Sequence, residues 1–285
     1  MSRLDRIPPT VLVLGAVASV QFGAAVAKSL FDEIGPGGTV FLRVLFAAII
    51  LAAAWRPGVA ARSRADLLLV VAFGFTLVAM NFTFYEALER IPLGIAVTFE
   101  FVGPLGVAIV GSRRALDLVW VVLAAAGIVL LSDFGTADLD TLGVGLALLA
   151  GGFWAAYILL AARVGQTYEG GQGLALAMSA GALMLAPVGV ADAGTNLLGP
   201  GVLLAGFAVA IMSSAIPYTL EMEALRRMPA GVFGVLMSLE PAMAALAGFI
   251  VLDEGLAARE LVAIVLVVAA SAGAARNSRV PPRDA

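Results

Sequence analysis

The chain has 285 residues, of which 61% are hydrophobic and only 13% are charged, and its mean hydropathy is +1.03. A soluble domain has about 25% charged residues, so this composition predicts a protein with many membrane-spanning segments. The chain has no Cys and no His, which excludes disulfides, thiol chemistry, an imidazole base and histidine metal sites. The first ten residues are polar, and no cleavage-site pattern follows the first apolar run. We therefore expect that run to be a retained span rather than a signal peptide.

A helix needs about 20 apolar residues to cross a bilayer core of about 30 Å. Ten runs in the chain approach this length, and short connections join them. The sequence therefore predicts an all-α integral membrane protein with ten transmembrane helices. The expected spans are residues 10–28, 36–55, 67–88, 92–112, 117–132, 141–161, 172–191, 200–220, 229–251 and 260–276.

The loop charges predict the orientation of these spans, because Lys and Arg favour the cytoplasmic side. With the N-terminus inside, thirteen Lys and Arg residues fall in inner segments and three in outer segments. Arg43 lies within a span and is not counted. We therefore expect both termini to be cytoplasmic.

A long segment of the chain is present twice, as Asn81–Pro104 and again as Tyr218–Pro241. Without gaps, Glu86-Ala87-Leu88 aligns with Glu223-Ala224-Leu225. We expect two five-helix repeats, 10–132 and 141–276, and an odd number of spans per repeat inverts the second. Inverted repeats with a site between them at the membrane midplane are typical of secondary transporters. The chain has no GxxxxGK[ST] motif, so it carries no ATPase of its own. A channel is an alternative, but a channel does not need an inverted duplication.

Three charged residues fall deep inside predicted spans. At a rise of about 1.5 Å per residue, Glu100 lies roughly 12 Å from the outer surface and Glu240 roughly 16 Å from the inner one. Arg43 lies roughly 10 Å from the outer surface. A charge at such depth costs at least about 2.5–3.5 kcal/mol, so it normally faces a partner or a wet cavity.

Two interpretations of these charges are open. One acid binds a substrate ammonium or carries a proton, since a poorly hydrated cavity lets a carboxyl group take up a proton more readily. Alternatively, Arg43 and Glu100 form an ion pair that only fixes helix packing. Glu240 has no obvious intramembrane partner in the sequence, which favours a functional role for it.

Further candidates surround these charges. Asn81 and Tyr85 share a helix face with Glu86, as an entry site or as an interfacial cap. Other residues that fit a cavity lining are Trp154, Tyr157, Ser214 and Tyr218. The helix-kink candidates are Pro104, Pro217 and Pro241, because proline removes a backbone donor. Four charged residues are expected in a solvated inner loop: Glu221, Glu223, Arg226 and Arg227.

Several long motifs resemble a known family. They include ALERIPLGIAVTFEFVGPL, GSRRALDLVWVVLAAAGIVLL and SSAIPYTLEMEALRRMPAGVFGVLMSLEPAMAAL. From about Val11 to Ala275 the chain is similar to EamA-type transporters of the drug/metabolite superfamily, in the threonine/homoserine exporter branch. The resemblance implies ten helices in inverted repeats, a bacterial inner membrane, and export of small neutral amino acids coupled to protons. Within it, Arg43, Glu100 and Glu240 match family motifs without assigned roles.

The predicted function is therefore a secondary exporter of threonine-like or homoserine-like amino acids, with protons as the second partner. The alternative within transport is another cargo, such as another metabolite, an aromatic amino acid or a drug. A membrane-embedded enzyme or a non-transporting receptor fits less well, because no catalytic motif is present and the loops are short. We expect no cofactor, no metal ion and no nucleic-acid partner, and a homodimer stays open.

Overall fold

The computed structural model describes residues 7–58, 63–91, 93–112, 114–131, 140–240, 242–243 and 258–277. The elements in these residues are helices, which confirms the predicted all-α class. In chain order they are α1 (Pro9–Trp55), α2 (Arg64–Leu88), α3 (Leu93–Glu100), α4 (Val102–Gly111), α5 (Ala115–Leu131), α6 (Thr141–Thr167), α7 (Gln172–Ala193), the 3₁₀ helix η2 (Gly194–Leu198), α8 (Pro200–Ala210), the π-helical turn η3 (Ile211–Ala215), α9 (Ile216–Leu225), α10 (Ala230–Met237) and α12 (Ala258–Asn277).

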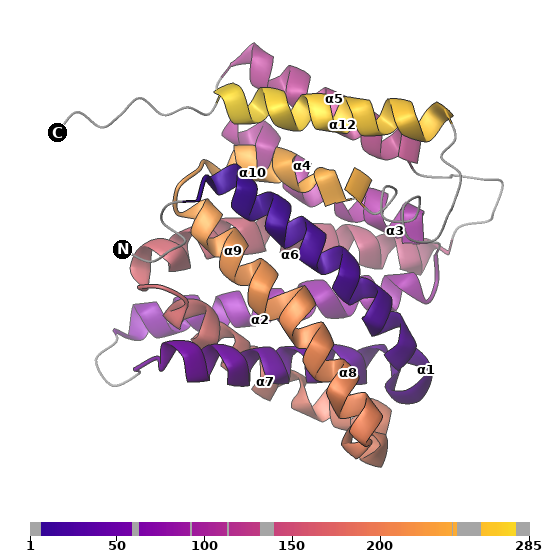
Figure 1. The fold of residues 1–285 in the computed structure, drawn as a ribbon, viewed down its shortest axis with the longest axis vertical. Helices are drawn as coiled ribbons and strands as arrows, with labels where there is room; N and C mark the ends of the chain where they lie inside the picture. Colours follow the sequence, from indigo (N-terminus) through magenta and orange to yellow (C-terminus); the bar gives the residue numbers. More distant parts are fainter. Residues whose placement is uncertain are drawn as a thin grey trace.

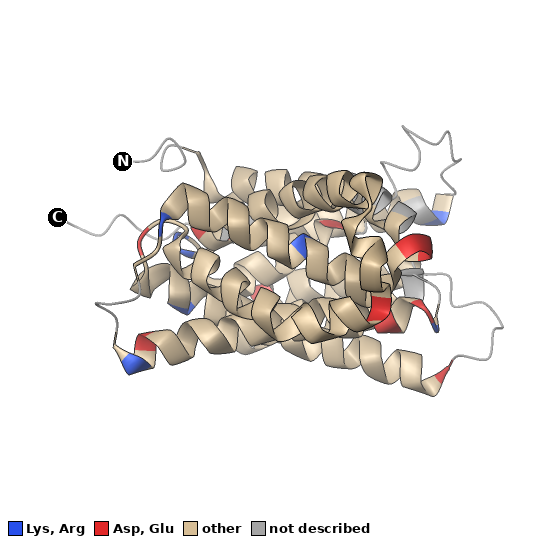
Figure 2. Ribbon diagram, turned by 90° about the horizontal axis from the view of Figure 1, so that it is seen from below, with Lys and Arg blue, Asp and Glu red and all other residues tan. Residues whose placement is uncertain are grey.

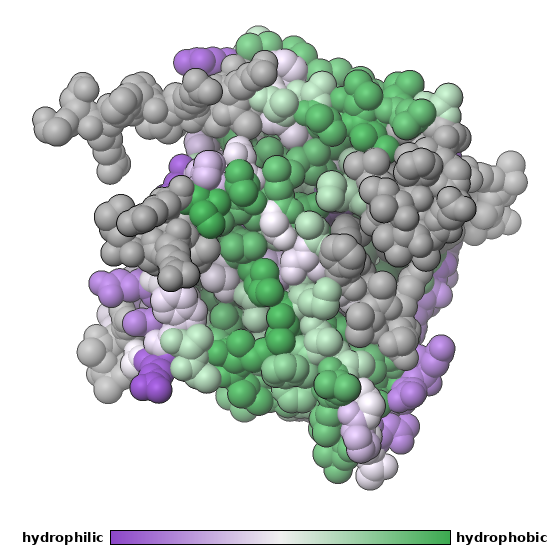
Figure 3. Space-filling model, viewed as in Figure 1, coloured by the Kyte–Doolittle hydropathy of each residue, from purple (hydrophilic) through white to green (hydrophobic). Residues whose placement is uncertain are grey.

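The outer surface of the helices is apolar, as a lipid environment requires. Within the described residues, five helical stretches are long and apolar enough to cross a membrane, and four shorter apolar helices accompany them. Large side chains such as Val110 and Leu183 are 88% and 78% exposed. Charged residues gather mostly at the two ends of the helices (Figure 2), and the face in Figure 3 is largely hydrophobic between its edges. The chain is a multi-pass membrane protein.

The first two predicted spans form one element. Helical residues continue from Pro9 as far as Ile34, where a loop was expected, and Gly35 interrupts them with a φ of 66°. Glycine adopts this left-handed conformation without a steric penalty, and Pro36 then restarts the helix with its fixed φ. The predicted loop is therefore a sharp kink, after which α1 runs in a different direction (Figure 1).

The fourth predicted span is broken into α3 and α4 by a turn at Phe101, and the ninth is broken at Ser238, after α10. The two breaks lie at equivalent positions of the duplicated segment. Phe101 has φ −64° and ψ −12°, and Ser238 has φ −61° and ψ −9°. Pro104 contributes to the first break, because it provides no N–H for the Glu100 carbonyl. Pro241 and most of the remaining ninth span lie outside the described residues.

The helices pack in two groups, with α6 and α9 between them (Figure 1). In the first group, α1 packs against α7, α8 and α9, and α2 packs against α6 and α7. In the second group, α5 packs against α12 and α4 against α10. The backbones of α4 and α6 approach closely at Gly103 and Gly151, where a Cβ on Gly103 would overlap the Gly151 carbonyl. This close approach holds α4, which follows the first break, directly against α6.

Candidate functional site

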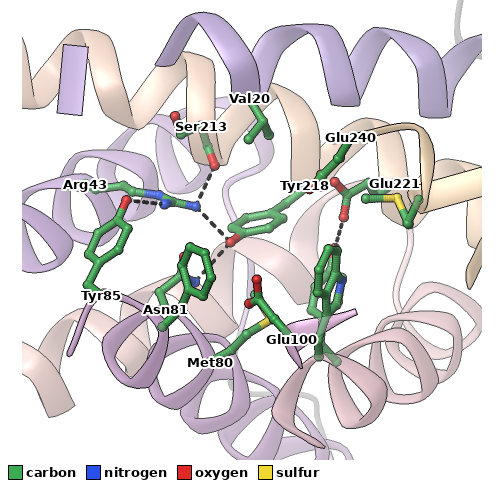
Figure 4. Close-up of a pocket in the computed structure, with 14 residues that line it drawn as sticks. Val20, Arg43, Met80, Asn81, Tyr85, Glu100, Ser213, Tyr218, Glu221 and Glu240 are labelled. Atoms are coloured by element: carbon green, nitrogen blue, oxygen red, sulfur yellow. Dashed lines mark hydrogen bonds between the residues drawn. The ribbon is translucent and has the colours of Figure 1, made fainter. Parts of the chain in front are cut away.

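A cavity of about 160 Å³ lies between the two halves of the chain. Residues of α1, α2, α3, α6, η3, α9 and α10 contribute to its wall (Figure 4). Its lining combines a guanidinium group, three carboxyl groups, three phenol hydroxyls and apolar side chains. The lining residues are Val20, Arg43, Met80, Asn81, Phe84, Tyr85, Glu100, Trp154, Tyr157, Ser213, Tyr218, Glu221, Met237 and Glu240.

Arg43 connects α1 to both halves of the molecule. Its Nε donates to Ser214 Oγ at 2.6 Å, and its Nη2 donates to the Ser213 carbonyl at 2.7 Å and to the Tyr218 hydroxyl at 2.9 Å. Its Nη1 donates to the Tyr85 hydroxyl at 3.1 Å. A buried guanidinium is tolerated when such partners replace water. Arg43, which is 7% exposed, is therefore held rigidly at one side of the cavity.

The π-helical turn η3 explains why a carbonyl is available to Arg43. The Ile216 N–H bonds to the Ile211 carbonyl, five residues back, and Pro217 has no N–H to offer the carbonyls of Met212 and Ser213. Side chains of α1 take the place of that donor, because Ser19 Oγ donates to the Met212 carbonyl at 2.6 Å and Arg43 donates to Ser213. Pro217 therefore does more than bend a helix: it exposes the backbone that α1 binds.

The three acids of the cavity lie in different surroundings. Glu221, which is 3% exposed, accepts a hydrogen bond from the Tyr157 hydroxyl at 2.6 Å. Glu100 is 8% exposed, and Glu240 follows the break after α10. Arg43 and Glu100 do not form the ion pair that was the structural alternative, since the salt bridges among the described residues involve Glu223 with Arg226 and Arg227. The cavity thus has three acids and one firmly bound guanidinium in its lining.

The structure gathers the sequence-predicted candidates closely. All of the predicted substrate-binding or proton-binding residues except Ser214 line the cavity, and the Ser214 hydroxyl accepts a hydrogen bond from Arg43. Asn81 and Tyr85 both line the cavity, whereas Glu86 of the same helix does not. Pro104 lies in the first turn of α4, after the break, and Pro217 in the first turn of α9.

One expectation about the charged residues was wrong. Glu221, expected in a solvated loop, is instead buried in the middle of α9 and lines the cavity. The signal was present, because Glu221 follows Tyr218 by three residues and helical neighbours at that spacing share a face. Sequence reasoning also missed five other lining residues, namely Val20, Met80, Phe84, Ser213 and Met237.

Much of the lining consists of pairs that the repeat relates. The offset that aligns the duplicated segments also pairs Asn81 with Tyr218, and Asn81 Nδ2 donates to the Tyr218 hydroxyl at 3.0 Å. The same offset pairs three further sets of lining residues: Val20 with Tyr157, Phe84 with Glu221, and Glu100 with Met237. The cavity therefore lies where equivalent parts of the two halves meet.

The relatives of the chain identify its family. A model of the EamA-like transporter family matches residues 141–276. The threonine/homoserine exporter RhtA of Escherichia coli K12 is 43% identical over 273 residues, which cover 95% of this chain and 92% of that protein. The chain belongs to the EamA-like transporter family. The family prediction made from the sequence motifs is confirmed.

Two further similarities agree with this EamA-like assignment. The threonine/homoserine exporter RhtA of Salmonella typhimurium LT2 is 40% identical over 277 residues, covering 96% of this chain and 94% of that protein. A crystal structure of a protein superposes with a TM-score of 0.76 at 19% identity, and the match covers 95% of this chain and 97% of that one. At that identity the second similarity shows the fold alone.

Proposed function

We propose that this EamA-like protein is a secondary exporter of threonine and homoserine that binds its cargo in the central cavity. The relatives that share 40–43% of its sequence over almost its whole length are named threonine/homoserine exporters. The cavity carries the proposal, because its volume of about 160 Å³ is far below the roughly 300–1,000 Å³ of a site for drug-sized ligands. Its lining offers opposite charges, as a small zwitterion requires.

The proposed topology has ten spans in two inverted repeats, 10–132 and 141–276, in the bacterial inner membrane, with both termini cytoplasmic. The excess of Lys and Arg in the inner segments supports this orientation. The repeat-related pairs around the cavity support a site on the axis between the repeats. In this topology the two halves rock against each other and expose the cavity to each side in turn. No enzymatic step is needed.

Protons are the proposed coupling ion. Three carboxyl groups and one guanidinium line the cavity, so full ionisation would leave an excess of negative charge in a poorly hydrated space. Such a group of acids is neutralised by protons or by the cargo's ammonium group. Because both would compete for the same acids, loading of one would release the other, which is the basis of antiport. Glu100 and Glu240 are the proposed acids for this exchange.

The proposed function is tested by flux of radiolabelled threonine and homoserine in proteoliposomes, with and without an imposed pH gradient. The wild-type protein should transport either amino acid faster when the imposed pH gradient drives protons across the membrane in the opposite direction. Glu240→Gln should abolish the gradient dependence at normal expression, because an amide cannot exchange a proton. Glu89→Gln is the matched control, since Glu89 is exposed and lies outside the cavity.

Each outcome tests a different part of the proposal: the cargo, the coupling to protons, or the role of Glu240. Absence of flux from a folded wild-type preparation would overturn the cargo assignment and favour another metabolite, with aromatic amino acids and drugs tested next. Flux that ignores the gradient would overturn proton coupling. Unchanged pH-dependent export by the Glu240→Gln variant would remove Glu240 from the proton pathway.

A further inference from the structure

The hydroxyl of Tyr218 is an acceptor for two donors. Arg43 Nη2 lies 2.9 Å from it and Asn81 Nδ2 lies 3.0 Å from it. A guanidinium has only donors, so the Tyr218 oxygen must accept from Arg43. The direction of the hydrogen bond with Asn81 depends on whether the amide nitrogen or the amide oxygen faces Tyr218.

The orientation of the Asn81 amide is fixed by the backbone. Its Nδ2 also lies 2.7 Å from the Leu77 carbonyl, which can only accept a hydrogen bond. The atom facing Leu77 is therefore the nitrogen, and the same nitrogen faces Tyr218. Both lone pairs of the Tyr218 oxygen are thus occupied, and its own O–H proton must point elsewhere.

Tyr85 is in a similar position. Its hydroxyl accepts from Arg43 Nη1 at 3.1 Å, so its proton also points away from the guanidinium. Among the described residues, no hydrogen-bond acceptor is found for the proton of Tyr85 or of Tyr218. Both side chains line the cavity. Two phenol O–H groups from α2 and α9 are therefore available to a ligand in it.

Arg43 has little capacity to bind a ligand directly. Four of its five N–H groups are used by Ser214, Ser213, Tyr218 and Tyr85. Its positive charge nevertheless polarises the two phenols that it bonds, because hydrogen bonds in a chain strengthen one another. Arg43 is thus a positioning residue, and the groups that reach the cavity are the phenol hydroxyls.

We propose that the hydroxyls of Tyr218 and Tyr85 bind the α-carboxylate of the cargo amino acid. This inference rests on the proposed function and adds the orientation of the substrate in the same cavity. Figure 4 shows Arg43 and the Glu100 carboxyl group on opposite sides of the Tyr218 hydroxyl. A zwitterion with its carboxylate on the phenols places its ammonium group toward the acids. The side-chain hydroxyl of threonine or homoserine then faces the remaining residues of the cavity lining.

The test compares two ligands that differ only at the carboxylate. L-Threonine and L-threoninol, in which CH₂OH replaces the carboxylate, are titrated into purified wild-type protein and the Tyr218→Phe variant. A hydrogen bond to a charged group corresponds to about tenfold to a hundredfold in affinity. Tyr218→Phe should weaken threonine binding by that factor and change threoninol binding by less than about threefold. Tyr168→Phe is the matched control, because the Tyr168 hydroxyl donates to the Asp66 carbonyl and lies outside the cavity, so the ratio of the two affinities should stay as in wild type.

The ratio of the threonine and threoninol affinities distinguishes recognition of the carboxylate by the Tyr218 hydroxyl from a purely structural role of that hydroxyl. Equal weakening of both ligands by Tyr218→Phe would mean that the hydroxyl only holds Arg43 and Asn81, and would overturn the inference. If that variant does not fold, Tyr85→Phe provides the same ratio, with the same expected direction. Wild-type protein that binds threonine and threoninol equally well would also overturn it, while leaving the proposed function intact. Binding of neither ligand by wild type would overturn the proposed function as well.

Discussion

The two copies of the duplicated segment have the same backbone break and different side chains around it. Each helix is interrupted three residues before its proline position, at Phe101 in the first copy and at Ser238 in the second. The position after the break that holds Gly103 in one copy holds Glu240 in the other. Gly103 allows the backbone of α4 to contact α6, whereas Glu240 lines the cavity.

The position directly before the break also differs, but here the first copy holds the acid. The first copy has Glu100 there and the second has Met237, and both line the cavity. Each copy therefore contributes one acid near its break, but on different sides of it. The two copies therefore break the backbone at equivalent positions but place their cavity-lining acids differently.

The largest predicted effect comes from adding a side chain where the first copy needs none. Gly103→Ala places a methyl group against the Gly151 carbonyl, so the α4 and α6 backbones must separate. Overpacking of this kind costs about 3 kcal/mol of unfolding free energy, at the upper end of the usual range. Thermal unfolding of the purified variant in detergent measures the loss.

Gly106→Ala is the control for this prediction, because open space surrounds Gly106 on the same helix. That variant should be as stable as wild type or more stable by up to about 1 kcal/mol, since Ala favours a helix more than Gly does. Equal stability of the two variants would show that the close contact at Gly103 does not hold α4 against α6.

Sequence analysis predicted the class of fold and most of the candidate site, because both leave a direct signal in apolar runs and buried charges. The details it missed depend on the backbone. The kink at Gly35 needs a φ that composition does not reveal, and the availability of the Ser213 carbonyl depends on a π-helical turn beside Pro217. Glu221 directly follows the expected span 200–220, so its charge alone predicts a solvated position, whereas α9 continues to Leu225.

The next prediction concerns the ends of the helices that carry the two segments. Arg226 of the second copy bonds to Glu223 at 2.8 Å, to the Gly165 carbonyl at 2.6 Å and to the Tyr168 carbonyl at 2.9 Å, and it also bonds to the Gly170 carbonyl. The last three lie at and beyond the end of α6. The repeat places Glu89 at the equivalent position of the first copy, where it is exposed. The end of α9 is therefore held to the end of α6 by a residue that has no counterpart at the end of α2.

Arg226→Ala should lower the unfolding free energy by about 2 kcal/mol, because it leaves several partly buried carbonyls without a donor. Arg226→Lys should recover only part of the loss, since an ammonium group lacks the planar fork of guanidinium. Glu89→Ala in the first copy should change stability by less than about 0.5 kcal/mol. Denaturant titrations of the three variants measure these values. Similar losses at both positions would contradict the difference between the two ends.

The smallest effect is expected where the helices of the two copies begin. Ser63 caps α2, because its Oγ accepts from the Asp66 N–H at 3.1 Å and Asp66 Oδ2 accepts from the Ser63 N–H at 3.3 Å. The equivalent position of the second copy is Pro200, the first residue of α8, which has no backbone N–H and therefore needs no acceptor for one. Ser63→Ala should therefore destabilise the protein by about 1 kcal/mol, since it leaves a backbone N–H of the first turn without its acceptor. Ser63→Asn should restore most of that stability in the same thermal unfolding assay, because the Asn side chain also accepts from the first turn. If Ala and Asn proved equally stable, water would serve this helix end as well as the side chain does, and the two copies would begin their helices at the same energetic cost.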